Sequence, residues 1–393
     1  MRTYVVRMFA LLILALAAAC GRGRFDAVPA PDVAVDSAPD AAPPVLSCAA
    51  PRFSIGDSSK GFAAIGTPRG YDVFAIDGSG QVQGYSYAFD TTNRATAQLV
   101  AEVSGKPVHP DASGPIGAVS VGDDVLVAAG YGQPPAGTDL IPLASTLDPL
   151  SGGAQRPGAF GAAGSLARNG NGTLVFASQP SLQTIDLRVV SALGADLAGP
   201  PPATASDGAT DINNPSVLAV GAKLLVVWNA ILSPSVVHAQ LFDEQLAPLT
   251  APLPVSPTQS SNTEFPRAAY APSADRTLVA WHQKAGGGDE VWFSLRNSTL
   301  GEVRSDRLAA QGILPVIAAG DDDFLVVWQD KSFPSKLSAA RVAMDGTVTH
   351  VSVSSTGGTA AGWDVVVRNG QPALVWAEAG GTGPNLWIDP LCP

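Results

Sequence analysis

A short apolar segment recurs through this sequence at intervals of about 50 residues, and it limits the folds that the chain can adopt. Four copies end in tryptophan, and they are Leu225–Trp228, Leu278–Trp281, Leu325–Trp328 and Ala373–Trp376. Three weaker copies end at Ile76, Ala129 and Ala177, so the seven ends lie 47 to 53 residues apart. One period through most of the chain indicates a single domain of repeated units, each of which buries apolar surface against its neighbours.

The best-preserved units contain four strand-like segments joined by turn residues. In the unit that begins at Pro266, the expected strands cover residues 267–271, 277–281, 290–295 and 302–308. The second segment is apolar throughout whereas the third alternates, so we expect the second strand to be buried on both faces. A period of this length with strands alone predicts an all-β fold, a seven-bladed β-propeller of four-stranded antiparallel blades. The four tryptophans of the repeat are then expected in the core.

The last unit lacks a fourth strand, and the start of the repeated body has one to spare. The expected strands of the last unit cover 363–367, 373–376 and 385–389, after which the chain stops at Pro393. Residues Arg52–Ile55 precede the first strand of unit one, at 61–65, in the place of a fourth strand. We therefore expect this N-terminal strand to complete the last blade. Cys48 and Cys392 would then be neighbours, and a disulfide between them is predicted, with up to about 5 kcal/mol of stabilisation.

The first 47 residues differ in kind from the repeated body. Arg2 and Arg7 precede the apolar run Met8–Ala19, which is too short to span a bilayer and predicts a cleaved signal peptide over residues 1–19. Residues 20–47 are rich in alanine, proline and aspartate without strand or helix period, which predicts an extended tether. The domain organisation expected is therefore signal 1–19, tether 20–47 and propeller 48–393.

The end of the signal region carries a more specific pattern. Leu16–Cys20 resembles the lipobox of bacterial lipoproteins. That resemblance implies that Cys20 becomes the lipidated N-terminus of the mature protein, and Gly21 after it favours the outer membrane of the cell envelope. The alternative is an ordinary cleaved signal peptide followed by a spare cysteine.

The charge balance excludes one class of partner. The formal net charge is −11 and the sequence has no basic patch, which argues against nucleic acid and anionic lipid surfaces. Membrane contact is therefore expected through the lipid on Cys20 alone.

Polar side chains follow the buried strands, at the end where they would gather on one face of a propeller. They are Asp77, Asn229, His282, Gln329, Asp330 and Glu378. Asp77, His282, Asp330 and Glu378 belong to units that are consecutive around a ring, so they form the candidate acid–base set. The simpler interpretation is a polar rim that satisfies strand ends, with Asn229, His282, Gln329, Asp330 and Glu378 available to a ligand. The remaining histidines lack zinc-ligand spacing, and no metal or cofactor is expected.

No catalytic signature is present, and the aspartates at 123–124 and 321–323 fit hairpin turns better than calcium sites. The repeat resembles the Leu-Val-Val-Trp propeller repeat of exported bacterial proteins, which implies a fold and no single activity. We expect a binding module for a protein or glycan partner, working through the loops 229–236, 282–290, 329–336 and 378–385. Trp292, Phe333 and Trp387 are candidate aromatic contacts. The alternatives are an extracytoplasmic hydrolase of an envelope or extracellular polymer, and a purely structural envelope protein.

Overall fold

The structure is a computed structural model, and the chain divides into residues 1–42 and 43–393. All described residues belong to the second unit, within 62–390. The residues left out inside that range are 68–69, 77–78, 91–97, 111, 132–136, 152–153, 155–161, 196, 198–202, 206–211, 232–234, 258–262, 286–287, 332–335, 352, 354–358, 369–370 and 380–384. The predicted signal peptide, tether, N-terminal strand, Cys20, Cys48 and Cys392 lie outside the described residues.

The described part of the chain consists of strands and turns, arranged as seven antiparallel sheets numbered here in chain order. Sheet 1 holds β1 (Phe62–Gly66), β2 (Tyr71–Ile76), β3 (Val82–Asp90) and β4 (Gln98–His109). Sheet 2 holds β5 (Ala112–Val121), β6 (Asp124–Tyr131) and β7 (Gly137–Leu143). Sheet 3 holds β8 (Ala162–Arg168), β9 (Leu174–Ser181), β10 (Thr184–Val190) and β11 (Ala203–Ala205). Sheet 4 holds β12 (Ile212–Val220), β13 (Lys223–Ala230), β14 (Val236–Phe242) and β15 (Leu253–Pro254).

The last three sheets follow the same order. Sheet 5 holds β16 (Thr263–Ala271), β17 (Arg276–Ala285), β18 (Gly288–Asn297) and β19 (Glu302–Ala309). Sheet 6 holds β20 (Ile313–Ala319), β21 (Asp323–Gln329), β22 (Leu337–Ala343) and β23 (Val348–Val351). Sheet 7 holds β24 (Thr359–Arg368), β25 (Gln371–Ala379) and β26 (Asn385–Pro390). Every sheet is a meander in which strands adjacent in sequence pair, as the repeat predicts. Five sheets have the predicted four strands, whereas sheets 2 and 7 have three among the described residues. The strands of sheet 5 are longer than expected, and β16 begins four residues before Arg267.

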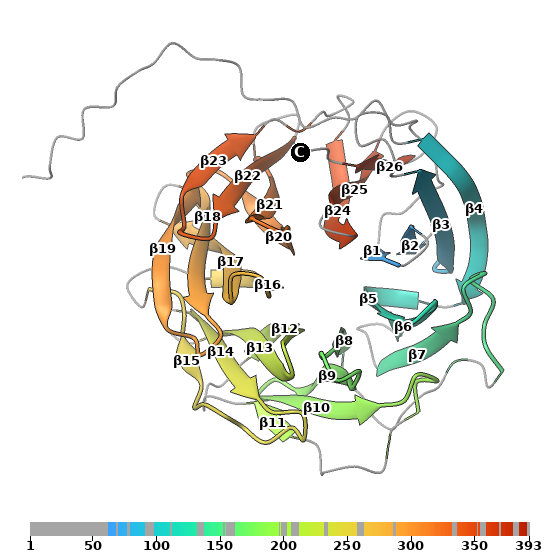
Figure 1. The fold of residues 1–393 in the computed structure, drawn as a ribbon, viewed down its shortest axis with the longest axis horizontal. Coiled ribbons are helices and arrows are strands. Elements are labelled where there is room, and N and C mark those ends of the chain that lie inside the picture. The colour runs from blue at the N-terminus through green and yellow to red at the C-terminus, as the bar shows by residue number, and fades with distance from the viewer. Residues whose placement is uncertain are drawn as a thin grey trace, which may run out of the picture. The chain divides into compact units, whose positions relative to one another are not determined.

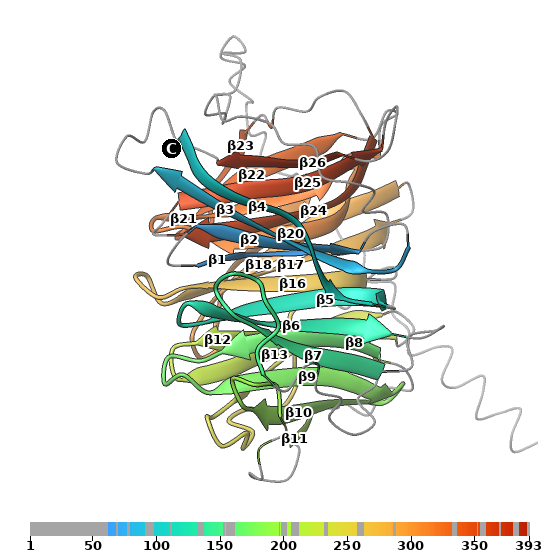
Figure 2. The same ribbon diagram turned by 90° about the vertical axis from the view of Figure 1, so that its right-hand side faces the viewer.

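The first strand of each sheet lies innermost in Figure 1, and the later strands lie progressively farther out. Each first strand contacts the first strand of the next sheet, and β1 contacts β24 as well as β5. The backbone N–H of Ala64 in β1 donates to Asp364 Oδ2 in β24 at 3.2 Å. In Figure 2 the strands run in one general direction, so their ends gather on two opposite faces. Residues at equivalent strand ends are therefore brought to the same face.

The hydrophobic core is divided among the spaces between adjacent sheets. In β13, Leu224, Val226 and Trp228 pack with apolar residues of sheet 3. The alternate residues Leu225 and Val227 pack with Val279 and Trp281 of sheet 5. Because successive side chains of a strand point to opposite faces, a strand covered on both sides needs an unbroken apolar run. This is why the second strand of each unit carries no polar alternation.

Each tryptophan of the repeat faces the preceding sheet. Trp228 packs against sheet 3, Trp281 against sheet 4, Trp328 against sheet 5 and Trp376 against sheet 6. All four are buried, with 0 to 3% of their surface exposed. The prediction that they are core residues is confirmed, and the structure adds that they fill the interfaces between units.

In two weaker copies of the repeat, the residue predicted to match the tryptophans faces the other neighbouring sheet. Ala177 is predicted at the tryptophan position, but it packs in the cluster between sheets 3 and 4. Its neighbour Phe176 faces the preceding sheet 2, as the tryptophans do. In unit one, Ile76 packs with the following sheet 2. A strand of apolar residues gives no sequence signal of which face each residue takes, unless a bulky side chain marks one of them.

Among the described residues, no helix has the length and hydropathy to cross a membrane.

Candidate functional site

A β-bulge interrupts the first strand of sheets 2 to 7 near its beginning. The pairing register shifts between Asn213 and Ser216 in β12, between Glu264 and Arg267 in β16, and at the equivalent place in β5, β8, β20 and β24. Asn214, Phe265 and Leu314 have positive φ angles of 54°, 52° and 53° at these bulges, and each precedes a proline. A bulge redirects the chain and re-aims the side chains beside it. In sheets 2 to 7 the bulge therefore divides the first strand into an outer end and an inner stretch.

The predicted site residues pair with the outer ends of the first strands. Asn229 pairs with Asn213, His282 with Glu264, Gln329 with Ile313 and Glu378 with Ala360. Asn229, His282 and Gln329 each follow the tryptophan of their strand directly, so they occupy structurally equivalent positions in sheets 4 to 6. Glu378 lies one residue farther along, because Ala377 separates it from Trp376. Of the four pairs, only His282 and Glu264 combine two ionisable groups.

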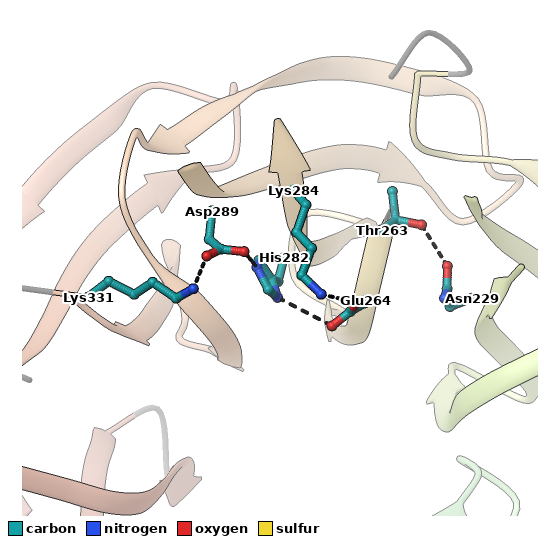
Figure 3. A network of polar contacts seen from close by, with 7 residues as sticks. All are labelled: Asn229, Thr263, Glu264, His282, Lys284, Asp289 and Lys331. Atoms are coloured by element: carbon teal, nitrogen blue, oxygen red, sulfur yellow. Dashed lines mark hydrogen bonds and ion pairs between the residues drawn. The ribbon is translucent and has the colours of Figure 1, made fainter. Parts of the chain in front are cut away.

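His282 lies at the centre of a chain of polar contacts, shown in Figure 3. His282 Nε2 lies 2.6 Å from Asp289 Oδ1, and His282 Nδ1 lies 3.9 Å from Glu264 Oε2. Lys284 Nζ donates to Glu264 Oε1 at 2.6 Å, and Lys331 Nζ donates to Asp289 Oδ2. Each carboxylate thus lies between the imidazole and one lysine.

The contacts continue onto the neighbouring sheets. Thr263 Oγ1 in β16 donates to Asn229 Oδ1 in β13 at 2.6 Å, which joins sheets 5 and 4. Lys331, which follows β21, joins sheet 6 to Asp289 of sheet 5. We call these seven side chains the rim network, and its members are Asn229, Thr263, Glu264, His282, Lys284, Asp289 and Lys331. The network spans three sheets at one strand end.

Burial sets the protonation of His282. Only 4% of the residue is exposed, and burial lowers the pKa of the imidazole to about 4, which the nearby Glu264 carboxylate opposes. The imidazole is therefore neutral at pH 7. Since a carboxylate only accepts hydrogen bonds, the proton lies on Nε2 and is donated to Asp289. His282 Nδ1 is then a buried acceptor without a hydrogen-bond donor among the described residues.

The exposed members of the network are its charged ends. The side chains of Lys284 and Lys331 are 50% and 48% exposed, and that of Glu264 is 29% exposed. Asp289 and Asn229 are largely or fully buried. The surface thus presents two ammonium groups and one carboxylate. The largely buried Asp289 holds Lys331, while Lys284 and Glu264 pair with each other.

Other predicted residues fall at or near this face. Asp330 is half-buried, and its backbone N–H donates to the Lys336 carbonyl at 2.8 Å. Gln329 ends β21, and Glu378 lies in β25, although only its backbone is described. Asp77 and Phe333 lie outside the described residues. The structure brings His282 together with Glu264 and Asp289, and the acid–base set of Asp77, His282, Asp330 and Glu378 stays a prediction.

The candidate aromatic contacts are also partly described. Trp292 is half-buried in β18, where its Nε1 donates to Glu290 Oε2 at 2.8 Å. Trp387 pairs with Trp376 across β25 and β26, and its side chain is not described. The aspartates at 123 and 321–322 lie in turns between strands, as predicted.

Inside the bulges, the first strands enclose a cavity of about 310 Å³. We call it the central cavity, and residues from the first strand of all seven sheets line it. Most of the lining residues are small or apolar, including Ala63, Gly117 and Val316, while Ser165, Asn214 and Ser216 add neutral polar groups. Arg267 of β16 and Asp364 of β24 are the charged residues of the described lining.

The two charged groups are held differently. Asp364 accepts hydrogen bonds from the backbone N–H groups of Ala64 and Val365, at 3.2 and 2.9 Å. Burial nevertheless raises the pKa of Asp364 to about 6, against the opposing effects of those bonds and of Arg267. Burial also lowers the pKa of Arg267, which the Asp364 charge opposes. Arg267 is exposed to the cavity although protein surrounds it, so its guanidinium stays charged within a confined space.

Sequence reasoning missed Glu264 and Asp289 as partners of His282, Lys331 as the partner of Asp289, and the cavity residues Arg267 and Asp364. The sequence signal for Arg267 and Asp364 is that each is a charged residue with apolar neighbours in the first strand of its unit. Pro215, Pro266 and Pro315 also recur at one place in their units and mark the bulge. Among the described residues, no group of three or more metal-ligating side chains is placed to hold an ion.

Comparison with known proteins identifies no relative by sequence. No family model matches the chain, and no curated protein matches it. A fucose-specific lectin from Aleuria aurantia is similar in structure, with 13% identity, 78% of this chain and 98% of the lectin covered, and a TM-score of 0.48. A Dyadobacter fermentans protein of unknown function gives 10% identity, coverages of 86% and 98%, and a TM-score of 0.48. An endo-arabinase from Bacteroides thetaiotaomicron gives 12% identity, coverages of 61% and 96%, and a TM-score of 0.38. Likenesses at this level carry no argument about the chemistry of this chain.

Proposed function

We propose that this protein is an envelope-anchored lipoprotein whose seven sheets form a closed β-propeller that binds a glycan. The rim network is the observation that carries the binding role. It places two lysines and a carboxylate on one face of the strands, where Lys331 pairs with the largely buried Asp289 and Lys284 pairs with Glu264. Sugar hydroxyls both donate and accept hydrogen bonds, so a surface that holds donors and acceptors in fixed positions suits a glycan. Anchoring through Cys20 would display this face at the cell envelope.

The competing function is hydrolysis of an envelope or extracellular polymer. A general acid or base must come within hydrogen-bond reach of its substrate. The His282 imidazole is 4% exposed, and carboxylates of its own sheet lie beside both of its nitrogens. Lys284 and Lys331 in turn occupy oxygens of those carboxylates. This arrangement favours binding over acid–base catalysis by His282.

Glycan binding is tested with the full-length protein extracted in detergent. It is presented with polysaccharides from envelope and extracellular matrix, fucosylated glycans among them. The double variant Lys284→Ala, Lys331→Ala is expected to bind its best glycan about tenfold or more weakly, because two charge-assisted hydrogen bonds are removed. Lys223→Ala is the matched control, since Lys223 begins β13 at the opposite strand end from Asn229. Equal loss in the control, or no glycan bound by the wild-type protein, contradicts the proposal. Shortening of the bound chains would instead favour the hydrolase.

Closure of the propeller is supported by the contact of β1 with β24 and by the bond between Ala64 and Asp364. We propose that the strand at 52–55 completes sheet 7, with Cys48 bonded to Cys392. The three cysteines then give one test. In membrane-extracted protein, denatured without reduction, no thiol is expected to react with iodoacetamide. Reduction should expose Cys48 and Cys392 alone, because acyl chains block Cys20. Labelling of Cys48 before reduction argues against closure, and labelling of Cys20 argues against the lipid anchor.

A further inference from the structure

Arg267 is a cation without a matching anion at bonding distance. Its Nη1 donates to the Pro266 carbonyl at 3.1 Å, and the described structure gives it no other hydrogen bond or ion pair. Asp364 also lines the central cavity, but its two carboxylate oxygens accept hydrogen bonds from the backbone N–H groups of Ala64 and Val365. A guanidinium carries five N–H donors in a planar fork, so most of the donors of Arg267 are unused. Because Arg267 lines the cavity and is exposed there, these donors are available to an anion that enters it.

The bulge explains why Arg267 occupies the cavity. Phe265 has a φ of 52°, an angle that residues with side chains adopt at a cost, and Pro266 follows it. The register shift between Glu264 and Arg267 lets two nearby residues of one strand reach different sites. Glu264 stays in the rim network, while Arg267 lines the cavity. At the equivalent positions in sheets 4 and 6, Ser216 and Val316 line the cavity without charge.

We propose that the central cavity binds a carboxylate-bearing ligand about the size of one sugar unit, with Arg267 as the anion-binding residue. The fork of a guanidinium matches the two oxygens of a carboxylate. A volume of about 310 Å³ lies at the small end of ligand pockets. Asn214 and Ser216 supply neutral polar groups for hydroxyls of the same ligand. The proposal rests on the cavity and does not require that the rim network binds a glycan.

The carboxylate has two possible sources, an acidic sugar and a free small acid, and titration calorimetry separates them. The full-length protein is titrated with methyl glucuronide, with methyl glucoside and with succinate. The two glycosides differ only in a carboxylate against a hydroxymethyl group. We expect at least one acid to bind, and the neutral glucoside to bind about tenfold or more weakly than the glucuronide if the sugar is the source. Binding of succinate alone assigns the site to a free acid. Equal binding of both glycosides, or binding of none of the three probes at millimolar concentration, overturns the proposal.

Variants locate the interaction. Arg267→Gln is expected to weaken binding of the acid about tenfold or more, and Arg267→Lys less, because lysine keeps the charge without the fork. Lys223→Gln, at the opposite strand end of β13, is the control and should leave this affinity unchanged. If Arg267→Gln does not fold, the wild-type protein supplies a second measurement. The bound acid should then slow the modification of Arg267 by phenylglyoxal, and unchanged modification counts against the site.

Asp364 provides a further check, because Arg267 and Asp364 are the titratable groups in the described lining of the cavity. With a pKa of about 6, Asp364 is mostly charged at pH 7 and mostly neutral at pH 5. Its negative charge repels a ligand carboxylate, so affinity should rise as the pH falls from 7 to 5. In Asp364→Asn this rise should disappear. An affinity that falls over this range in the wild-type protein contradicts the proposal.

Discussion

Replacement of Trp281 by alanine lowers the free energy of unfolding by about 3–5 kcal/mol, the range for large aromatic residues removed from a core. Trp281 is fully buried and packs against sheet 4, among residues that include Leu225, Val237 and Leu241. The loss of its ring opens a cavity between two sheets, and neither sheet can close it without moving away from its other neighbour. Chemical denaturation followed by circular dichroism measures the change.

A control for Trp281→Ala is available on the surface. Leu182→Ala removes a side chain that is 62% exposed, and it should change the free energy of unfolding by less than about 0.5 kcal/mol. A cost for Trp281→Ala as small as that of the control would mean that the interface between sheets 4 and 5 contributes little to stability.

Between pH 6.5 and pH 4, His282 should make the protein progressively less stable as the pH falls. Its pKa is about 4 in the folded protein and 6.5 in the unfolded chain. The unfolded chain therefore binds a proton in this range that the folded protein excludes. The contribution is fully present above pH 6.5, and about 3 kcal/mol of it is lost by pH 4.

The measurement compares wild type with His282→Gln, whose amide keeps a donor for Asp289. The difference in free energy of unfolding between the two should shrink by about 3 kcal/mol from pH 7 to pH 4. The comparison is needed because Asp364 acts in the opposite direction. Its pKa is raised from 3.8 to about 6, so its contribution is present below pH 3.8 and is lost as the pH rises through 6. A difference that stays constant would mean that the His282 imidazole titrates normally in the folded protein.

Sequence reasoning predicted the strands and their order well, because a strand buried on both faces has a continuous apolar run, whereas a half-exposed strand alternates. The second strands, the meanders and the four core tryptophans are as expected. The prediction of which neighbouring sheet a residue faces was wrong at Ala177 and Ile76, where no bulky residue distinguishes one face of the strand from the other. The bulges were also missed, since an extra residue in a strand changes the pairing without changing the composition.

The sequence predicted where the candidate site residues lie, but it did not predict which side chains they contact. Residues at the ends of second strands do share one structural position, as the repeat implies. The contacts of His282 come instead from Glu264 on the preceding strand and Asp289 on the following one, and Asp289 is in turn paired with Lys331 of the next sheet. Such contacts depend on the register between paired strands and on the distance between neighbouring sheets, and the residue spacing within one strand predicts neither.

The placement of apolar clusters between sheets bears on how the protein responds to proteases. Each cluster joins two consecutive repeats, so a cut in a surface connection between sheets severs the backbone and leaves the apolar contacts on both sides of the cut in place. The two fragments should therefore remain associated and copurify until denaturant separates them. A nicked molecule would therefore keep the rim network in place.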